Sequence, residues 1–430
     1  MKRYSIQGTT FEQVKSAGGS DIKEAPRLGL IFANLDEKAA RYLESQGCRV
    51  KEIKNIKATQ VTAPVTPPAP IPGAVGYTPV ELMAAIGFSE EWRNIVQPPL
   101  YGEGFAVAII DSGIRESHEL VKGRVVYSQN FTQSPMRDGF DHGTGVASIV
   151  AALAPKCDIL NLKVLDDEGA GTDEAVALGI DAVIELKETR PDIFPYVINL
   201  SLGEEDEGDA SDPVRIACRA ALDHGIFVLA AAGNAGPEPG TIMSPACERY
   251  VGAVGSASYN PADPQYPFLV SQFSSRGPTR EGLLKPDALL PGEQIKMASA
   301  QSDTATAVKS GTSFACPFGS GVIVISGEGA MKQALTWPEY LSVVGSPTWV
   351  APTPHDILDY WLPRICLKPA IAPGGKDPEY GWGIPFGDVL ATRGLVLSPT
   401  AALGEMLTPL LTLGLVGMLT SNLMQAGRVK

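Results

Sequence analysis

Residues 80–391 alternate between two kinds of hydrophobic pattern. Continuous apolar runs rich in Val, Ile, Leu and Ala occur at 105–110, 158–164, 196–202 and 226–232. Segments with helical spacing at 173–188 and 212–225 separate the later runs. Buried strands that alternate with helices are typical of a parallel sheet covered on both faces. The pattern predicts an α/β fold, with a doubly wound, mostly parallel sheet and helices on both faces.

The first 60 residues form a separate pattern, which predicts a small α+β unit. A strand is expected at 27–35 and a helix at 36–47, capped by Asn34 or Asp36 and ended by Gly47. An alternating segment that begins at Cys48 predicts an edge strand. Residues 61–79 hold prolines every few positions and no charge until the next domain, which predicts a stiff, extended linker.

The main domain is expected at 80–395, and a hydrophobic tail follows at 396–430. Within the tail, residues 401–426 carry a single acid, Glu405, and reach the length of a membrane span of about 20 residues. Pro409 and several hydroxyl and amide side chains dilute that signal. A docking helix or a partner-binding tail is therefore favoured, and membrane contact through 401–426 is the alternative.

The charge of the chain limits the classes of partner that it can bind. The net charge of −13 argues against nucleic acid as the main partner, because phosphate binding needs clustered Lys and Arg. Residues 203–209, GEEDEGD, hold five acids. They are read either as a solvated loop or as a rim that attracts basic substrate residues, with an ion site as a further alternative.

The cysteines and the N-terminus leave the compartment open. The six cysteines include no C-x-x-C pair, which gives no sign of a zinc or dithiol site and leaves disulfides undecided. The N-terminal sequence lacks the apolar stretch of a secretory signal. We expect a cytoplasmic or non-classically exported protein, with C-terminal membrane anchoring as the alternative.

Three polar residues stand where apolar runs or glycine turns end. Asp111 follows FAVAII, His142 lies in DHGTGVA, and Ser313 lies in SGTSFACP. A serine nucleophile needs a base to take its proton, and the base needs an acid that fixes its tautomer. A helix N-terminus also disfavours imidazolium, which keeps a histidine available as a base. The three residues together therefore predict acyl-transfer chemistry.

The same three segments, in the order Asp, His, Ser, resemble the catalytic boxes of subtilisin-like serine proteases. The resemblance implies a serine endopeptidase that forms an acyl-enzyme on Ser313, with His142 as base and Asp111 as its orienting acid. It also implies that Asn234, in AAGN, stabilises the oxyanion. Substrate-binding residues implied in the same way are Ser201, Leu202, Gly203, Ala231, Ala232 and Gly233.

Further segments extend the resemblance to about 80–391: FSSRGP at 273–278, KPDALLPG at 285–292 and YGWGIPFGDVLA at 380–391. Residues 29–53 resemble, more weakly, the second half of the family's inhibitory propeptide. The resemblance therefore implies a self-processing zymogen, whose partners are peptide or protein substrates and its own N-terminal segment.

Two departures from the family pattern matter. The segment after the His142 helix is too short for the usual calcium-binding loop, so no cofactor is expected, with calcium kept as an alternative. Phe318 stands where the family usually has histidine, a structural position.

An α/β-hydrolase is disfavoured because Ala315 breaks the G-x-S-x-G motif. The remaining alternative is a catalytically silent peptide-binding module on the same fold.

Overall fold

The structure is a computed structural model of the 430-residue chain. It describes residues 1–59, 76–93, 99–262, 267–336, 358–359, 362–369 and 372–387. Most of the predicted linker and all of the predicted tail at 396–430 lie outside these residues. Within the described part, no helix is long and apolar enough to cross a membrane.

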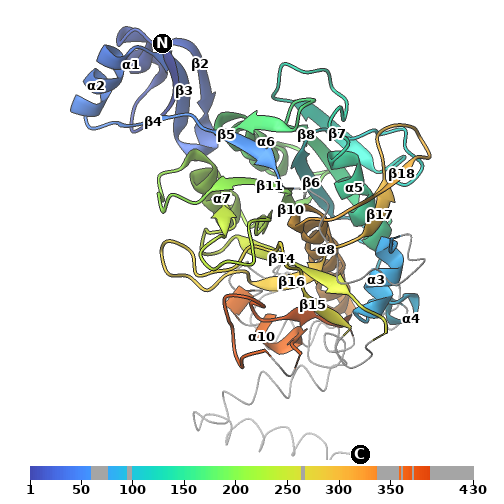
Figure 1. The fold of residues 1–430 in the computed structure, drawn as a ribbon. Helices are drawn as coiled ribbons and strands as arrows, with labels where there is room; N and C mark the ends of the chain where they lie inside the picture. Colours follow the sequence, from blue (N-terminus) through green and yellow to red (C-terminus); the bar gives the residue numbers. More distant parts are fainter. Residues whose placement is uncertain are drawn as a thin grey trace, which may run out of the picture.

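An eight-stranded sheet forms the centre of the molecule (Figure 1). Its strands are β6 (Ala106–Asp111), β7 (Val125–Asn130), β8 (Asp158–Lys163), β10 (Pro195–Leu200), β12 (Phe227–Ala231), β14 (Gly252–Tyr259), β15 (Phe268–Val270) and β16 (Ala288–Pro291). The order is β15-β14-β12-β10-β6-β8-β7, and β16 pairs with β14. Only the β14–β15 pair is antiparallel. The four apolar runs of the sequence are β6, β8, β10 and β12, and the predicted fold class is confirmed.

Helices cover both faces of this sheet. They are α3 (Pro79–Ala85), α4 (Glu90–Arg93), α5 (Gly143–Leu153), α6 (Asp173–Thr189), α7 (Pro213–Asp223), α8 (Thr312–Thr336) and α10 (Leu362–Ile365). Val107 and Ile109 of β6 pack in the core that contains α5 and α8. The alternate residues Ala108 and Ile110 pack in the core that contains α6 and α7. Because successive strand residues point to opposite faces, one continuous apolar run supplies both cores.

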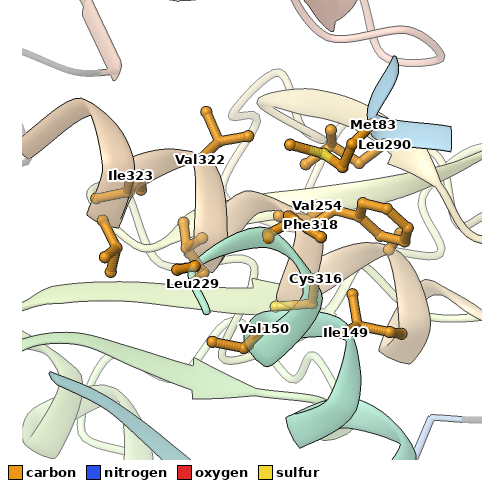
Figure 2. Close-up of a cluster of buried hydrophobic side chains, with 14 of the residues drawn as sticks. Met83, Ile149, Val150, Leu229, Val254, Leu290, Cys316, Phe318, Val322 and Ile323 are labelled. Atoms are coloured by element: carbon orange, nitrogen blue, oxygen red, sulfur yellow. The ribbon is translucent and has the colours of Figure 1, made fainter. Parts of the chain in front are cut away.

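Phe318 lies in the first of these cores, with no exposed surface. Figure 2 shows its ring from α8 among side chains that include Ile149 of α5, Leu229 of β12 and Leu290 of β16. The position that usually holds histidine in similar sequences is therefore an apolar packing position in this chain.

The N-terminal unit has its own four-stranded antiparallel sheet, in the order β2-β3-β1-β4. Its elements are β1 (Lys2–Gln7), α1 (Phe11–Ser16), β2 (Ser20–Ala25), the 3₁₀ helix η1 (Pro26–Leu28), β3 (Leu30–Leu35), α2 (Glu37–Ser45) and β4 (Arg49–Glu52). Asp36 caps α2 by accepting from the Ala39 amide at 2.7 Å. The predicted strand, helix and edge strand are β3, α2 and β4. The first 25 residues, β1, α1 and β2, were not anticipated.

The two faces of this sheet have different partners. Ile6 and Leu35 pack with α1 and α2 in a small core of the unit itself. Leu30 and Phe32 point to the other face and share a core with α6 and α7. The unit is therefore docked on the main domain through an apolar face (Figure 1).

Beyond β4, the chain enters a second sheet, whose strand order is β13-β11-β5-β9. Its strands are β5 (Asn55–Ala58), β9 (Ala170–Thr172), β11 (Leu202–Glu205) and β13 (Met243–Ser244). Two antiparallel pairs complete the described strands: β17 (Ile295–Ala298) with β18 (Thr306–Lys309), and β19 (Cys366–Leu367) with β20 (Ile384–Pro385). The N-terminal unit thus ends between two strands of the main domain.

The start of α8 is fixed by an unusual hydrogen bond. Pro317 lies in the first turns of α8 and has no N–H, so the Ser313 carbonyl loses its ordinary i+4 partner. Ser201 Oγ donates to that carbonyl instead, at 2.7 Å. Asn199 Nδ2 in turn donates to Ser201 Oγ at 2.9 Å, and Ser320 Oγ donates to Asn199 Oδ1 at 3.0 Å. This buried chain joins the end of β10 to the first two turns of α8.

Replacing Ser201 by alanine should destabilise the protein, because it leaves the buried Ser313 carbonyl and the Asn199 amide without this partner. We expect a loss of about 1–3 kcal/mol in the free energy of unfolding. Urea unfolding followed by tryptophan fluorescence, with both variants made in a Ser313→Ala background, measures it. Ser258→Ala is the matched control, because its hydroxyl also donates to a carbonyl, Leu269 O, but at an exposed position. Equal stabilities of the two variants would contradict this account.

Candidate active site

Asp111 and His142 meet at the carboxyl edge of the central sheet. Asp111 is the last residue of β6, and His142 is the N-cap residue of α5. His142 Nδ1 lies 2.8 Å from Asp111 Oδ1, and both side chains are buried. Since a carboxylate only accepts, this contact assigns the proton to Nδ1 and leaves Nε2 as an acceptor in the neutral ring. His142 Nε2 is buried and has no hydrogen-bond partner among the described residues.

Asp138 holds this pair in place, and sequence reasoning missed it. Its Oδ1 accepts from Ser112 Oγ at 2.8 Å and from the His142 amide at 3.2 Å. Its Oδ2 accepts from the Thr144 amide at 2.8 Å. Asp138 therefore caps the first turn of α5 and ties it to the residue after Asp111. An acid four residues before a histidine that opens a helix was the available signal.

Ser313 lies at the start of α8, and its side chain is directed at Thr59 of the N-terminal segment. Ser313 Oγ donates to Thr59 O, and it lies 2.6 Å from Thr59 Oγ1 and 3.1 Å from Ser201 O. The ring of the next residue, Phe314, has its centroid 5.1 Å from that of His142. The structure thus brings the three predicted residues to one site, with the serine hydroxyl bonded to Thr59.

Asn234 also contacts the Thr59 carbonyl oxygen. Its Nδ2 donates to Thr59 O at 2.6 Å. Its Oδ1 accepts from the Thr312 amide at 2.9 Å and from Thr312 Oγ1 at 3.0 Å. The two bonds from Thr312 fix the amide so that its N–H groups face the carbonyl. A donor held in this way is suited to an oxygen that gains negative charge.

The turn that carries Asn234 depends on Gly233. Gly233 has a φ of +111°, and a Cβ there would meet Met243 Cγ at 2.6 Å. Only glycine fits such a turn without strain. Its amide donates to Thr312 Oγ1 at 3.2 Å, and the preceding Ala232 amide donates to Val254 O at 2.9 Å. Both bonds are to residues of the main domain, Thr312 of α8 and Val254 of β14. The substrate contacts suggested for Ala231, Ala232 and Gly233 stay predictions.

Thr59 is placed by its own strand, β5, which lies antiparallel between β11 and β9. Ala58 pairs with Leu202, and Lys57 pairs with Gly203. On the other side, Ile56 pairs with Gly171. The Thr59 amide donates to Ser201 O at 3.2 Å. Ser201, Leu202 and Gly203 therefore lie along the N-terminal segment, whereas the contribution of β9 was missed because its three residues carry no strand pattern.

A set of acids surrounds two lysines of the same segment. Lys54 Nζ lies 2.7 Å from Glu207 Oε2, and Lys51 Nζ lies 2.8 Å from Asp209 Oδ2. Burial, reinforced by the neighbouring Asp212, raises the pKa of Glu204 to about 8. Burial also raises the pKa of Asp173 to about 7, against the effect of amide donors such as Lys54 N. These carboxyl groups therefore lie in a poorly solvated place beside the segment.

No metal centre was found in the part of the chain that the structure describes: no three His, Cys, Asp or Glu side chains there are arranged to hold an ion. The expected lack of a cofactor, with calcium as the alternative, stays a prediction.

All six cysteines are unpaired. Cys316, three residues after Ser313, is fully buried, and burial raises the pKa of its thiol well above the ordinary value.

Comparison with solved structures finds similar folds. Fervidolysin from Fervidobacterium pennivorans, described as a keratinolytic enzyme related to subtilisin, has a TM-score of 0.68 at 19% identity. The match covers 92% of this chain and 61% of that one. The S41 psychrophilic protease has a TM-score of 0.55 at 25% identity, over 72% of this chain and 98% of that one.

Curated sequences agree with this. Serine protease AprX of Bacillus subtilis is 31% identical over 254 residues, which are 53% of this chain and 57% of the relative. Subtilisin-like protease 5 of Arthroderma gypseum is 31% identical over 234 residues, 54% of each chain. The chain thus spans little more than half the length of these relatives. The model of the subtilase family matches residues 102–383, which is most of the sequence. The chain belongs to the subtilase family.

Proposed function

We propose that the protein is a serine endopeptidase that cleaves peptide bonds through an acyl-enzyme intermediate. The observation that carries this proposal is the arrangement around Thr59. Its carbonyl oxygen accepts from Asn234 Nδ2 at 2.6 Å and from Ser313 Oγ, while its strand is held between β9 and β11. A peptide substrate is expected to bind as an added, extended strand. One of its carbonyl groups then lies between the serine hydroxyl and an amide donor.

In the proposed reaction, Ser313 Oγ attacks the carbonyl carbon of the residue that occupies the place of Thr59. His142 Nε2, which is free to accept, takes the hydroxyl proton once the serine turns toward it. Asp111 stabilises the imidazolium through the 2.8 Å bond to Nδ1. Asn234, together with the Ser313 amide, binds the oxyanion. The imidazolium then protonates the leaving amine. Water next attacks the acyl-enzyme while His142 takes its proton, and His142 returns a proton to Ser313 Oγ as the acid product leaves.

We further propose that residues 1–59 are an inhibitory propeptide, which the enzyme removes by cutting between Thr59 and Gln60. The support is that Thr59 ends the strand at the nucleophile, while Phe32 and its neighbours anchor the unit on α6 and α7. A tethered segment has a high effective concentration and blocks the site until it is cut.

One observation favours a second candidate, a catalytically silent module that binds peptides. Ser313 Oγ bonds to Thr59 and Ser201, and His142 Nε2 has no partner among the described residues. A fluorophosphonate probe separates the two functions. It should label Ser313 of the processed protease, whereas a silent module should leave Ser313 unlabelled.

Replacing Ser313 by alanine should lower kcat for casein hydrolysis by about 10⁶-fold, because the nucleophile is lost. The matched control is Ser310→Ala, which removes a nearby hydroxyl that accepts only from the Gln294 amide at 3.0 Å. The control should keep its activity, and both variants should keep the circular dichroism spectrum of the parent. Undiminished hydrolysis by the Ser313→Ala protein would end the protease proposal.

Replacing Asn234 by alanine should lower kcat by about 10²–10³, the size found when one oxyanion donor of a serine protease is removed, with little change in KM. Steady-state hydrolysis of a peptide anilide measures both constants. Asn260→Ala, which alters an exposed turn, is the control. An effect confined to KM would assign Asn234 to substrate binding rather than to the transition state.

The wild-type chain should yield a fragment whose mass corresponds to residues 1–59, and the Ser313→Ala chain should remain intact. A synthetic or separately expressed 1–59 fragment should inhibit the processed enzyme, because it restores β5 between β9 and β11. A 1–54 fragment, which keeps β1–β4 but lacks β5, is the matched control and should inhibit at least about tenfold less. Mass spectrometry and inhibition assays test this. An intact wild type with full activity would refute the propeptide.

A further inference from the structure

Lys54 lies five residues before Thr59, and its side chain is surrounded by acids of the main domain. Lys54 Nζ lies 2.7 Å from Glu207 Oε2, 3.8 Å from Glu204 Oε1 and 3.9 Å from Asp212 Oδ2. The Lys54 amide donates to both Asp173 oxygens, each at 3.1 Å. We call Asp173, Glu204, Glu207 and Asp212 the acidic site.

The acidic site belongs to the main domain and remains when residues 1–59 leave. With residues 1–59 docked, the side chains of Glu204 and Asp212 are only 8% and 4% exposed, whereas that of Glu207, the acid nearest Lys54, is 56% exposed. Glu204 Oε1 is buried without a hydrogen bond among the described residues. Glu205, the next residue, is 83% exposed and pairs with Arg280 instead. The acid-rich run of the sequence is therefore divided into buried and solvated members.

Carboxylates held close together repel one another, and a cation among them offsets that repulsion. Lys54 supplies that cation, and burial and Asp212 still raise the pKa of Glu204. In the described part of the chain, the ammonium groups within 4 Å of these carboxylates are those of Lys54 and Lys51, and both belong to the N-terminal unit. Once that unit has left, the site favours a new cation in the same place.

We propose that the acidic site is a substrate subsite that binds a Lys or Arg side chain at the sixth position before the scissile bond. The inference rests on the proposed protease function. The register supports it, because pairing of β5 with β9 and β11 fixes the distance between the nucleophile and the acids. An incoming strand in that register places its sixth residue where Lys54 lies. Basic peptide segments upstream of the cut are thus the preferred substrates.

The test compares three peptide anilides based on residues 50–59, with the reporter on the Thr59 carboxyl group. One has the parent sequence, the second carries Lys54→Met, and the third carries Lys57→Met. Lys57 is exposed, and its methionine variant removes the same charge at a position away from the acidic site. With the processed wild-type enzyme, the Lys54→Met peptide should show a kcat/KM about tenfold lower than the parent. The Lys57→Met peptide should stay within about twofold of the parent.

Enzyme variants then locate the effect. The double variant Glu204→Gln with Glu207→Gln should hydrolyse the parent and Lys54→Met peptides within about twofold of each other. Glu205→Gln, the matched control, removes a charge from the same run without touching Lys54, and it should retain the tenfold preference. A ratio of kcat/KM values cancels any change in the amount of active enzyme, so a poorly processed variant still gives a valid result.

The outcomes are distinct. Equal hydrolysis of the parent and Lys54→Met peptides by the wild type overturns the subsite and leaves the protease function standing. A preference that persists in the double variant, or that Glu205→Gln also abolishes, overturns the assignment to the acidic site. Hydrolysis of none of the peptides by the wild type overturns the protease function and the subsite with it.

Discussion

The organisation of the site depends on the antiparallel insertion of β5 between β9 and β11. Backbone pairing on both sides fixes the position of residues 55–58 along β9 and β11. It thereby fixes Thr59, whose carbonyl oxygen reaches Asn234 Nδ2 at 2.6 Å. A shift by one residue would move that carbonyl away and turn the buried Ile56 to the opposite face. Backbone register, rather than any side chain, therefore decides which carbonyl group meets Ser313 and Asn234.

Ser201 connects that register to the nucleophile itself. Its carbonyl accepts from the Thr59 amide at 3.2 Å, and its hydroxyl donates at 2.7 Å to the Ser313 carbonyl that Pro317 leaves free. One residue at the end of β10 thus touches both the bound strand and the helix that carries the serine. The hydrogen bond from Ser201 is needed because Pro317 has no N–H to donate and a buried carbonyl requires a partner.

Sequence patterns predicted the parts that depend on regular periodicity. The apolar runs predicted β6, β8, β10 and β12, since buried parallel strands need no alternation. Asp36, one of the two cap residues expected for α2, is the observed cap. What the sequence left hidden depends on contacts between distant segments. Asp138 acts through three donors from residues 112 to 144, and the three-residue β9 is paired with β5, more than 100 residues earlier in the chain. The role of Asn199 was not predicted, because it consists of hydrogen bonds with Ser201 and Ser320, which come together only in the folded chain.

Charge distribution adds a second level of recognition between the N-terminal unit and the main domain. Residues 1–59 carry eleven Lys and Arg against seven Asp and Glu, although the whole chain has a net charge of −13. The basic side chains face acids on α6 and beyond: Arg3 Nε lies 2.6 Å from Glu174 Oε2, and Arg27 Nη1 lies 3.3 Å from Asp181 Oδ2. The apolar face around Phe32 packs in a core shared with α6 and α7, and these ion pairs add orientation to that contact. Lys54 likewise lies within 3.9 Å of three acids, Glu204, Glu207 and Asp212, so the same charge complementarity extends along the chain to within five residues of Thr59.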